Sequence, residues 1–316
     1  MADGDESNPL KTAPQIAASL AKDVYQDALQ PPMRVLGSAL EGIMQAVAHY
    51  PRYWGLISNI SLEEKRKRFE EKLKNKAGAI PEEHRVLPHP NIVGPVIQAL
   101  EYSIFNDELS DMFSSLLTGA MDSRTAGLAH PAFAEVIKQL TVDEAKIIKS
   151  VSSKIPVGYK IDAENSRVYD VELDGNPLLM PIINVSLRAK DGFSQQLTQS
   201  NICGICAQAQ CSYPERESAY IDNIIRLGVL EVKFTTWLAD DSQYSGLQNA
   251  IYERPRSLLG SSDYASSEQI IEKGILRLTE FGRSFIAVCV IDPSDLFSQW
   301  QKVEEMLKST QENPHA

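Results

Sequence analysis

The sequence predicts a mainly α (α+β) protein, in which an N-terminal helical layer is followed by a winged-helix-like domain with a small β-sheet. Through the first half of the chain, apolar residues recur every three to four positions, which is the period of an amphipathic helix. After Pro156 the pattern changes to strand-like alternation. Near the C-terminus, the order helix, glycine, strand, wing, strand and helix is typical of a winged helix.

The composition is that of an ordinary globular protein. The chain has 316 residues, of which 43% are hydrophobic and 23% are charged, so a sizeable core can be buried. The formal net charge is -11. Because an acidic chain repels phosphate backbones unless its basic residues gather on one face, nucleic acid is not the expected partner.

The chain is expected to be cytoplasmic. No hydrophobic run reaches the ~18 residues that a membrane-spanning helix needs. The N-terminal sequence MADGDESNPLK has neither the basic start nor the apolar core of a signal peptide. In the cytosol the four cysteines would be kept as free thiols.

We expect four segments along the chain. They are a disordered tail (1–10), a helical domain (11–154), a winged-helix-like α+β domain (155–291) with an insertion at about 236–273, and a C-terminal helix and tail (292–316).

The first half is predicted to be helical throughout. The first expected helices cover 14–29, the apolar segment 33–48 and a charged segment at 63–76, which a capping box at Ser61 opens. A pair follows at 92–104 and 107–120, with Pro95 in the first turn of the helix at 92–104. A short helix is expected after Pro131, and another is opened by the Thr141–Glu144 capping box.

The second half is predicted to mix strands and helices. Strands are expected at 168–173, 178–187, 229–235 and 275–279, and helices at 195–208, 215–227 (capped by Gly228) and 280–290.

The sequence contains no recognised catalytic signature. It lacks the P-loop, the dinucleotide-binding glycine pattern, the HExxH zinc motif and the GxSxG nucleophile elbow. This favours a protein that is not an enzyme, and we predict no catalytic residue and no cofactor.

Cys203, Cys206 and Cys211 form the sharpest cluster of chemically reactive side chains. A structural zinc site needs four nitrogen or sulfur ligands, and this cluster supplies three, with Cys289 as a distant fourth. Small buried core residues are the favoured interpretation, and a metal site is the weaker alternative.

Two further groups are predicted to bind a partner. The first is a surface cluster of Lys65, Arg66, Arg68, His84 and His89, for which a solvated helix and an exposed turn are the plain alternatives. The second is a contact face on the candidate recognition helix, formed by Arg216, Asn223 and Arg226. Because carboxylates make that helix net negative, contact with protein is favoured over contact with DNA.

Three stretches resemble the abortive-infection alpha family: residues 91–149, SAYIDNIIRLGVLEV at 218–232 and LTEFGRSFIAVC at 278–289. The most specific parts are HPAF and QLTVDEA, and the resemblance extends over roughly residues 20 to 290. It implies a role in bacterial defence against phage, in which the infected cell is stopped or killed. It supplies no catalytic residue.

Three hypotheses follow. The first is an anti-phage protein that acts through contacts with a protein partner or with itself. The second is a membrane-perturbing effector that uses the apolar segment 33–48. The third is a nucleic-acid-binding regulator that uses the charged helix and the winged helix.

Overall fold

The structure is a computed structural model that describes residues 41–43, 59–153, 157–162, 167–173, 179–188, 195–252 and 268–292. The chain divides into two compact units. The first comprises Met1–Gln139, Ile161–Asp170 and Val288–Ala316, and the second comprises Leu140–Lys160 and Val171–Ala287.

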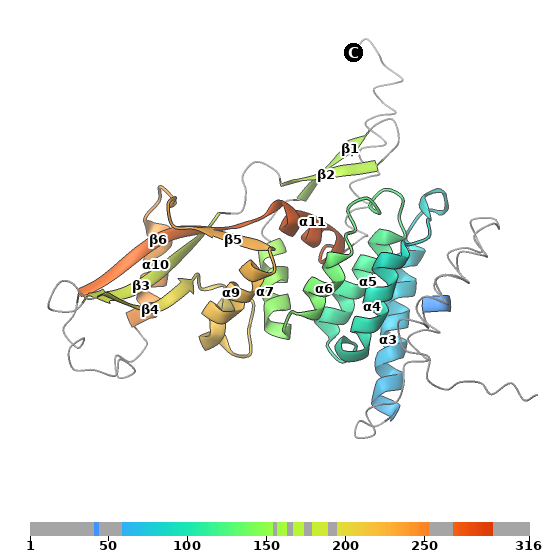
Figure 1. The fold of residues 1–316 in the computed structure, drawn as a ribbon, viewed down its shortest axis with the longest axis horizontal. Helices are drawn as coiled ribbons and strands as arrows, with labels where there is room; N and C mark the ends of the chain where they lie inside the picture. Colours follow the sequence, from blue (N-terminus) through green and yellow to red (C-terminus); the bar gives the residue numbers. More distant parts are fainter. Residues whose placement is uncertain are drawn as a thin grey trace, which may run out of the picture. The chain divides into compact units, whose positions relative to one another are not determined.

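Most of the described part of the first unit is a helical layer (Figure 1). It contains α3 (Asn59–Gly78), the 3-10 turn η2 (Glu82–His84), α4 (Pro90–Ser103), α5 (Asp107–Ala120) and α6 (Ala132–Lys138). α5 packs against α3, α4 and α6. Its central position explains why eleven of its residues are buried, among them Met112 and Phe113.

Two predicted helix starts are wrong in this layer. α3 begins at Asn59, so Ser61 lies inside the helix and opens no capping box. α4 begins at Pro90 with His89 as its N-cap, which places Pro95 in the helix interior rather than in the first turn. Proline at the first helical position loses no hydrogen bond, so Pro90 is the better start. The predicted start of α5 is confirmed.

The second unit contains a four-stranded antiparallel sheet in the order β4-β3-β6-β5. The strands are β3 (Met180–Arg188), β4 (Gln195–Ile202), β5 (Leu230–Lys233) and β6 (Glu268–Leu278). β6 pairs with the whole of β3, from Met180 opposite Leu276 to Arg188 opposite Glu268. A separate two-stranded sheet is formed by β1 (Val157–Asp162) and β2 (Arg167–Leu173).

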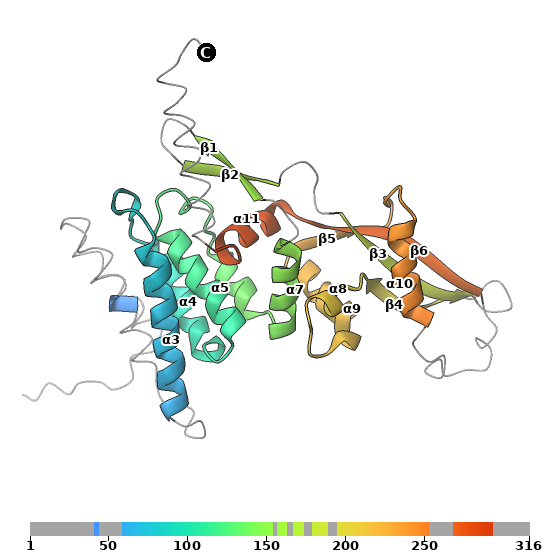
Figure 2. The ribbon, with the colours of Figure 1, turned by 180° about the vertical axis from the view of Figure 1, so that it is seen from behind.

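The second unit also contains helices. They are α7 (Val142–Ser152), the short α8 (Ile205–Gln208), α9 (Glu217–Arg226), α10 (Ser242–Tyr252) and α11 (Glu280–Cys289), of which α11 belongs to the unit as far as Ala287. α10 packs against β3 (Figure 2). Tyr244 and Leu247 of α10 join Ile183 and Val185 of β3 in a small core. The predicted capping box of α7 is confirmed at Thr141 and Glu144.

The predicted fold class, mainly α with a small sheet, is confirmed by these helices and strands. The expected order α9, Gly228, β5, β6 and α11 is present, with Gly228 at φ +76°. β6 lies between β3 and β5 in the sheet. The winged-helix assignment rests on the order of elements and stays a prediction.

The predicted helix at 195–208 is wrong. Residues 195–202 form β4, because they pair with β3, and α8 occupies only Ile205–Gln208. Gly204 lies between β4 and α8 with φ +71°, a left-handed conformation that glycine adopts at low cost. The predicted insertion at 236–273 contains α10 and the first six residues of β6.

Several predicted segments lie outside the described residues. They are the helix at 14–29, the apolar segment 33–48 apart from residues 41–43, and the C-terminal helix beyond residue 292. Within the described ranges, no helix is long and apolar enough to cross a membrane.

Gly282 should accept no larger side chain without a loss of stability. A Cβ atom there would overlap the backbone oxygen of Val229, whereas one at Gly246, inside α10, would meet nothing within 4 Å. We expect Gly282→Ala to destabilise the protein by at least about 2 kcal/mol, because backbone must shift. Gly246→Ala should stabilise it by up to about 1 kcal/mol, because glycine disfavours helix. Urea unfolding measures both, and equal effects of the two substitutions would contradict this account.

Candidate functional site

Most of the basic face of α3 is paired within the first unit. Lys65 lies 3.0 Å from Asp107, and Lys76 lies 2.8 Å from Asp111 and 2.8 Å from the hydroxyl of Ser115. The hydrogen bond from Lys65 lowers the pKa of Asp107 below its ordinary value. These contacts tie α3 to α5 and leave fewer cations for a partner than the sequence suggests.

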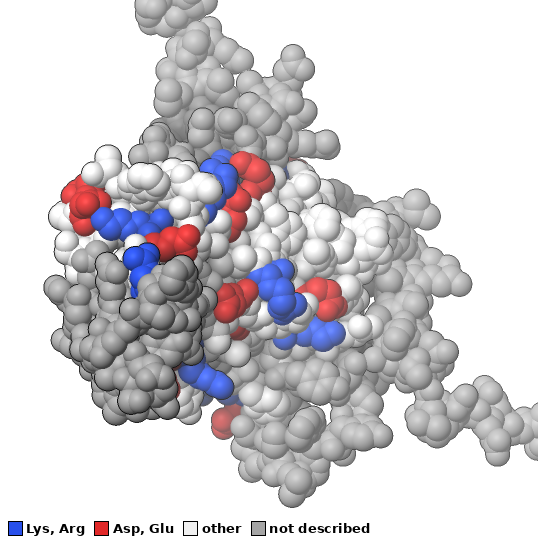
Figure 3. Space-filling view, turned by 60° about the vertical axis from the view of Figure 1, so that its left-hand side comes forward, with Lys and Arg blue, Asp and Glu red and all other residues white. Residues whose placement is uncertain are grey.

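The other predicted cations of this helix differ in exposure: Arg66 is half-buried and Arg68 is exposed. On the face of the molecule in Figure 3, lysines and arginines are interspersed with carboxylates, with no continuous basic stripe. Binding of a partner by this cluster stays a prediction.

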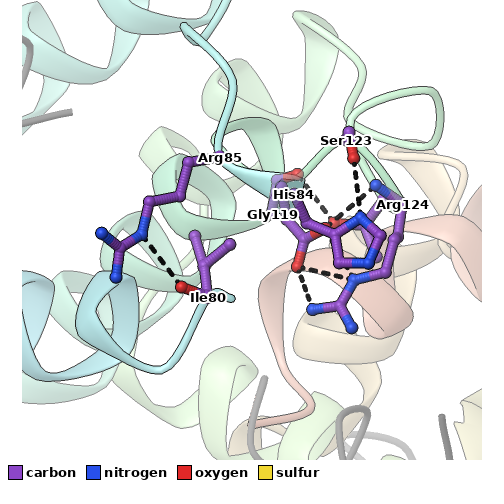
Figure 4. Close-up of polar contacts among 8 residues, drawn as sticks. Ile80, His84, Arg85, Gly119, Ser123 and Arg124 are labelled. Atoms are coloured by element: carbon purple, nitrogen blue, oxygen red, sulfur yellow. Dashed lines mark hydrogen bonds and ion pairs between the residues drawn. The ribbon is translucent and has the colours of Figure 1, made fainter. Parts of the chain in front are cut away.

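His84 and His89 each make hydrogen bonds within the first unit. The Nδ1 atom of His84 is 3.2 Å from the hydroxyl of Ser123, and the amide of Ser123 donates to the carbonyl of His84 at 2.8 Å (Figure 4). His89 accepts a hydrogen bond from the amide of Asn91 at 3.2 Å and thereby caps α4. The structure therefore gives the two imidazoles separate structural partners.

A buried ion pair beside His84 was not predicted from the sequence. Asp122 is 1% exposed and Arg124 is 4% exposed, and the guanidinium binds both carboxylate oxygens, with Nε–Oδ1 at 2.9 Å and Nη2–Oδ2 at 2.6 Å. Next to it, Thr125 donates to the carbonyl of Gly119 at 2.8 Å (Figure 4). An aspartate two residues from an arginine is too common in turns to mark such a pair in advance.

The predicted contact face of α9 is partly used inside the second unit. The amide nitrogen of Asn223 donates to Glu144 at 2.8 Å, and its oxygen accepts from Arg226 at 2.6 Å. Arg216 lies exposed in the turn before α9. Asn223 would have to give up these bonds to read a base edge, which disfavours a DNA-reading role.

The three cysteines lie in a segment that two carboxylates hold in place. We call residues 201–213 the thiol turn. The carboxylate of Glu217 accepts hydrogen bonds from the amides of Cys203, Gly204 and Cys206 at 2.8, 2.8 and 3.0 Å. Glu217 is 8% exposed, so these amides replace the water that a carboxylate would otherwise bind.

Asp143 of α7 holds the far end of the same turn. Its carboxylate accepts from the amide of Ser212 at 2.9 Å, the amide of Tyr213 at 3.2 Å and the hydroxyl of Tyr220 at 3.1 Å. Burial alone would raise the pKa of Asp143, but these donors and Lys146 outweigh it and lower the pKa. The pKa of Tyr220 rises to about 12, through burial and its bond to Asp143.

The thiols match the predicted core residues in part. Cys203 and Cys206 are buried and Cys211 is half-buried. Burial raises the pKa of both Cys206 and Cys211. Among the described residues, no group of three or more His, Cys, Asp or Glu side chains has the arrangement to hold a metal ion.

The sequence also did not predict two exposed aromatic side chains. Trp237 is 61% exposed and Tyr213 is 59% exposed, and within the described residues these are the exposed large hydrophobic side chains. Trp237 lies in residues 234–241, which we call the Trp237 turn. Nothing in the sequence separates an exposed tryptophan from a buried one, because the difference arises from the packing of the turn.

The Trp237 turn is fixed to the sheet by one buried hydroxyl. Tyr244 is fully buried, and its hydroxyl accepts from the amide of Leu238 at 2.9 Å and donates to the carbonyl of Gly274 at 2.9 Å. Gly274 also leaves room for the ring of Phe234 at the start of the turn, because a Cβ atom on residue 274 would lie 2.6 Å from that ring.

These units define the class of the protein: an α+β protein with a helical layer and a small antiparallel sheet. The chain matches the abortive infection alpha family over residues 59–289, and it belongs to that family. This confirms the resemblance found in the sequence. No curated protein and no solved structure matches the chain.

Asp143 should contribute stability that depends on pH. Its folded-state pKa lies below the ordinary 3.8, so its contribution is complete above that pH and is lost as the pH falls through the folded-state value. We expect Asp143→Asn to lower stability at pH 7 by on the order of 2 kcal/mol, because an amide cannot accept all three bonds. The difference in stability between the wild type and Asp143→Asn should become smaller as the pH falls.

Denaturant unfolding at pH 7 and below pH 3.8 tests this. The control is Glu215→Gln, an exposed carboxylate two residues after Tyr213, which should change stability little. A deficit for Asp143→Asn that stays constant with pH would contradict the assignment.

Proposed function

We propose that this protein defends bacteria against phage by abortive infection, and that it acts by binding a protein partner through the Trp237 turn. Membership of the abortive infection alpha family supports the biological role. The observation that carries the molecular role is the exposed Trp237 on a turn that a buried tyrosine hydroxyl fixes in place.

A rigid exposed tryptophan is suited to protein binding. Burial of one tryptophan removes roughly 150–250 Å² from water, and tryptophan is enriched among the residues that dominate binding energy. Because Tyr244 already orders the turn, little conformational entropy would be lost when a partner covers the indole.

The charges beside Trp237 indicate the chemistry of the partner. Asp240 and Asp241 follow it in the chain and are exposed, and Asp241 lies 2.9 Å from Lys273. Hydrogen bonds from Ser242 lower the pKa of Asp240 below its ordinary value. The fitting partner surface is an apolar pocket bordered by lysine or arginine, which also steers the encounter.

The other two hypotheses have less support in the described residues. The membrane hypothesis rests on segment 33–48, of which only residues 41–43 are described. The nucleic-acid hypothesis needs free cations and a free Asn223, whereas Lys65, Lys76 and Asn223 are engaged within the protein.

The role itself is tested by phage plating on bacteria that express the full chain, together with culture survival at low and high phage dose. Protection at low dose with collapse of the culture at high dose is the expected result. Protection with full survival at high dose would contradict an abortive mechanism, and no protection across a broad phage panel would contradict the defence role.

The molecular proposal is tested by Trp237→Ala in the same assay. We expect loss of most of the protection, by at least about tenfold in plating efficiency, since removal of a binding hot spot costs 2 kcal/mol or more, or about thirtyfold in affinity. Stability should change by less than about 0.5 kcal/mol, because the side chain is exposed.

The matched control is Thr236→Ala, the exposed neighbour of Trp237, which should protect like the wild type. If Trp237→Ala protects as well as the wild type, the Trp237 turn is not the contact surface. The defence role is tested separately, by the plating and survival results of the wild type.

A further inference from the structure

α8 ends in a backbone arrangement that brings two cysteines together. Gln210 adopts φ +53°, its amide donates to the carbonyl of Ala207 at 3.4 Å, and the amide of Cys211 donates to the carbonyl of Cys206 at 3.0 Å. This pair of hydrogen bonds around a left-handed residue is the Schellman motif. In that motif the side chains at the positions of Cys206 and Cys211 frequently contact each other.

Here the two contacting side chains are thiols. The thiol of Cys206 hydrogen-bonds to that of Cys211, and the Sγ atom of Cys211 lies 3.8 Å from the carbonyl oxygen of Asp143. From this geometry we propose that Cys206 and Cys211 form a reversible disulfide when the protein meets a two-electron oxidant such as hydrogen peroxide.

Hydrogen bonds to two carboxylates fix the thiol turn and so keep Cys206 close to Cys211. Glu217 fixes the amides of Cys203, Gly204 and Cys206 before the motif, and Asp143 fixes those of Ser212 and Tyr213 after it. A non-glycine residue in the left-handed region is strained, and surrounding contacts of this kind are what maintain it. The thiol contact is thus a property of the folded turn and not a chance approach of mobile chain.

Exposure sets the order of the chemical steps. Cys206 is 1% exposed, whereas Cys211 is half-buried, so the oxidant reaches Cys211 first. The Cys211 thiolate attacks one peroxide oxygen, the O–O bond breaks, and a sulfenic acid forms with release of water once the departing hydroxide takes a proton. Cys206 then attacks the sulfur of Cys211, and its own proton leaves with the hydroxyl group as a second water.

The neighbouring groups make this reaction slow at neutral pH. Burial raises the pKa of Cys211, and the negative charges of Asp143 and Glu217 act in the same direction. The hydrogen bond from Cys206 and the charge of Lys146 oppose that rise. Because the thiolate is the nucleophile, the rate should increase by up to about tenfold per pH unit while the pH is below the pKa of Cys211.

Cys203 is the competing partner. It forms a CxxC pair with Cys206, but Gly204, at φ +71°, separates the end of β4 from α8, and Cys203 lies outside the Schellman motif. Cys211, inside the motif, is therefore the thiol that the backbone hydrogen bonds bring to Cys206.

The test uses the reduced full chain treated with hydrogen peroxide, followed by alkylation of the remaining thiols in denaturant. All three cysteines lie between Lys190 and Arg216, so a single tryptic peptide carries them and fragmentation identifies the bridge. We expect loss of two alkylatable thiols, a Cys206–Cys211 bridge in that peptide, full recovery with dithiothreitol, and faster oxidation at higher pH.

Three single variants complete the experiment. Cys203→Ser should still form the bridge, whereas Cys206→Ser and Cys211→Ser should not. Because Cys206 is buried and its substitution could disturb folding, Cys211→Ser, at the half-buried position, is the deciding variant. A Cys203–Cys206 bridge, a bridge that persists in Cys211→Ser, or oxidation that stops at sulfinic acid without any bridge would each overturn the proposal.

Discussion

The second unit depends on two buried carboxylates that bind backbone amides. Asp143 on α7 and Glu217 on α9 together accept five hydrogen bonds from the backbone of the thiol turn. Burial of a carboxylate is costly unless donors replace its water, and amides without partners are costly too. The carboxylates and the amides therefore satisfy each other's need for a hydrogen-bond partner. These bonds position the end of β4, the start of α8 and the exposed Tyr213.

The first unit meets the same requirement with an ion pair. The turn that contains Asp122 and Arg124 is buried, and the bidentate contact neutralises both charges where water is excluded. Removal of one partner would leave an uncompensated buried charge. His84 also stabilises this turn through its hydrogen bonds with Ser123. The imidazole that the sequence suggested for partner binding therefore has a structural contact.

The sequence predicted what local patterns determine and missed what pairing determines. The Thr141 capping box, the start of α5 and the strand β2 follow from short-range rules, and the structure has them. β4 was predicted as a helix because its strand state depends on β3, which no local pattern reveals. The cations of α3 looked like a binding surface, because the facing Asp107 and Asp111 lie on a helix about 40 positions later.

The cysteines show how spacing in the sequence can mislead. The CxxC spacing suggests that Cys203 and Cys206 belong together, yet the backbone places Gly204 in a left-handed conformation between them. The pair that the backbone joins is Cys206 and Cys211, five residues apart, across the hydrogen bonds that end α8. Side chains on a turn meet according to the hydrogen bonds of the backbone that carries them. Asp143 connects the two parts of this arrangement, because its backbone carbonyl lies beside the thiol of Cys211 and its carboxylate accepts from the amide of the exposed Tyr213.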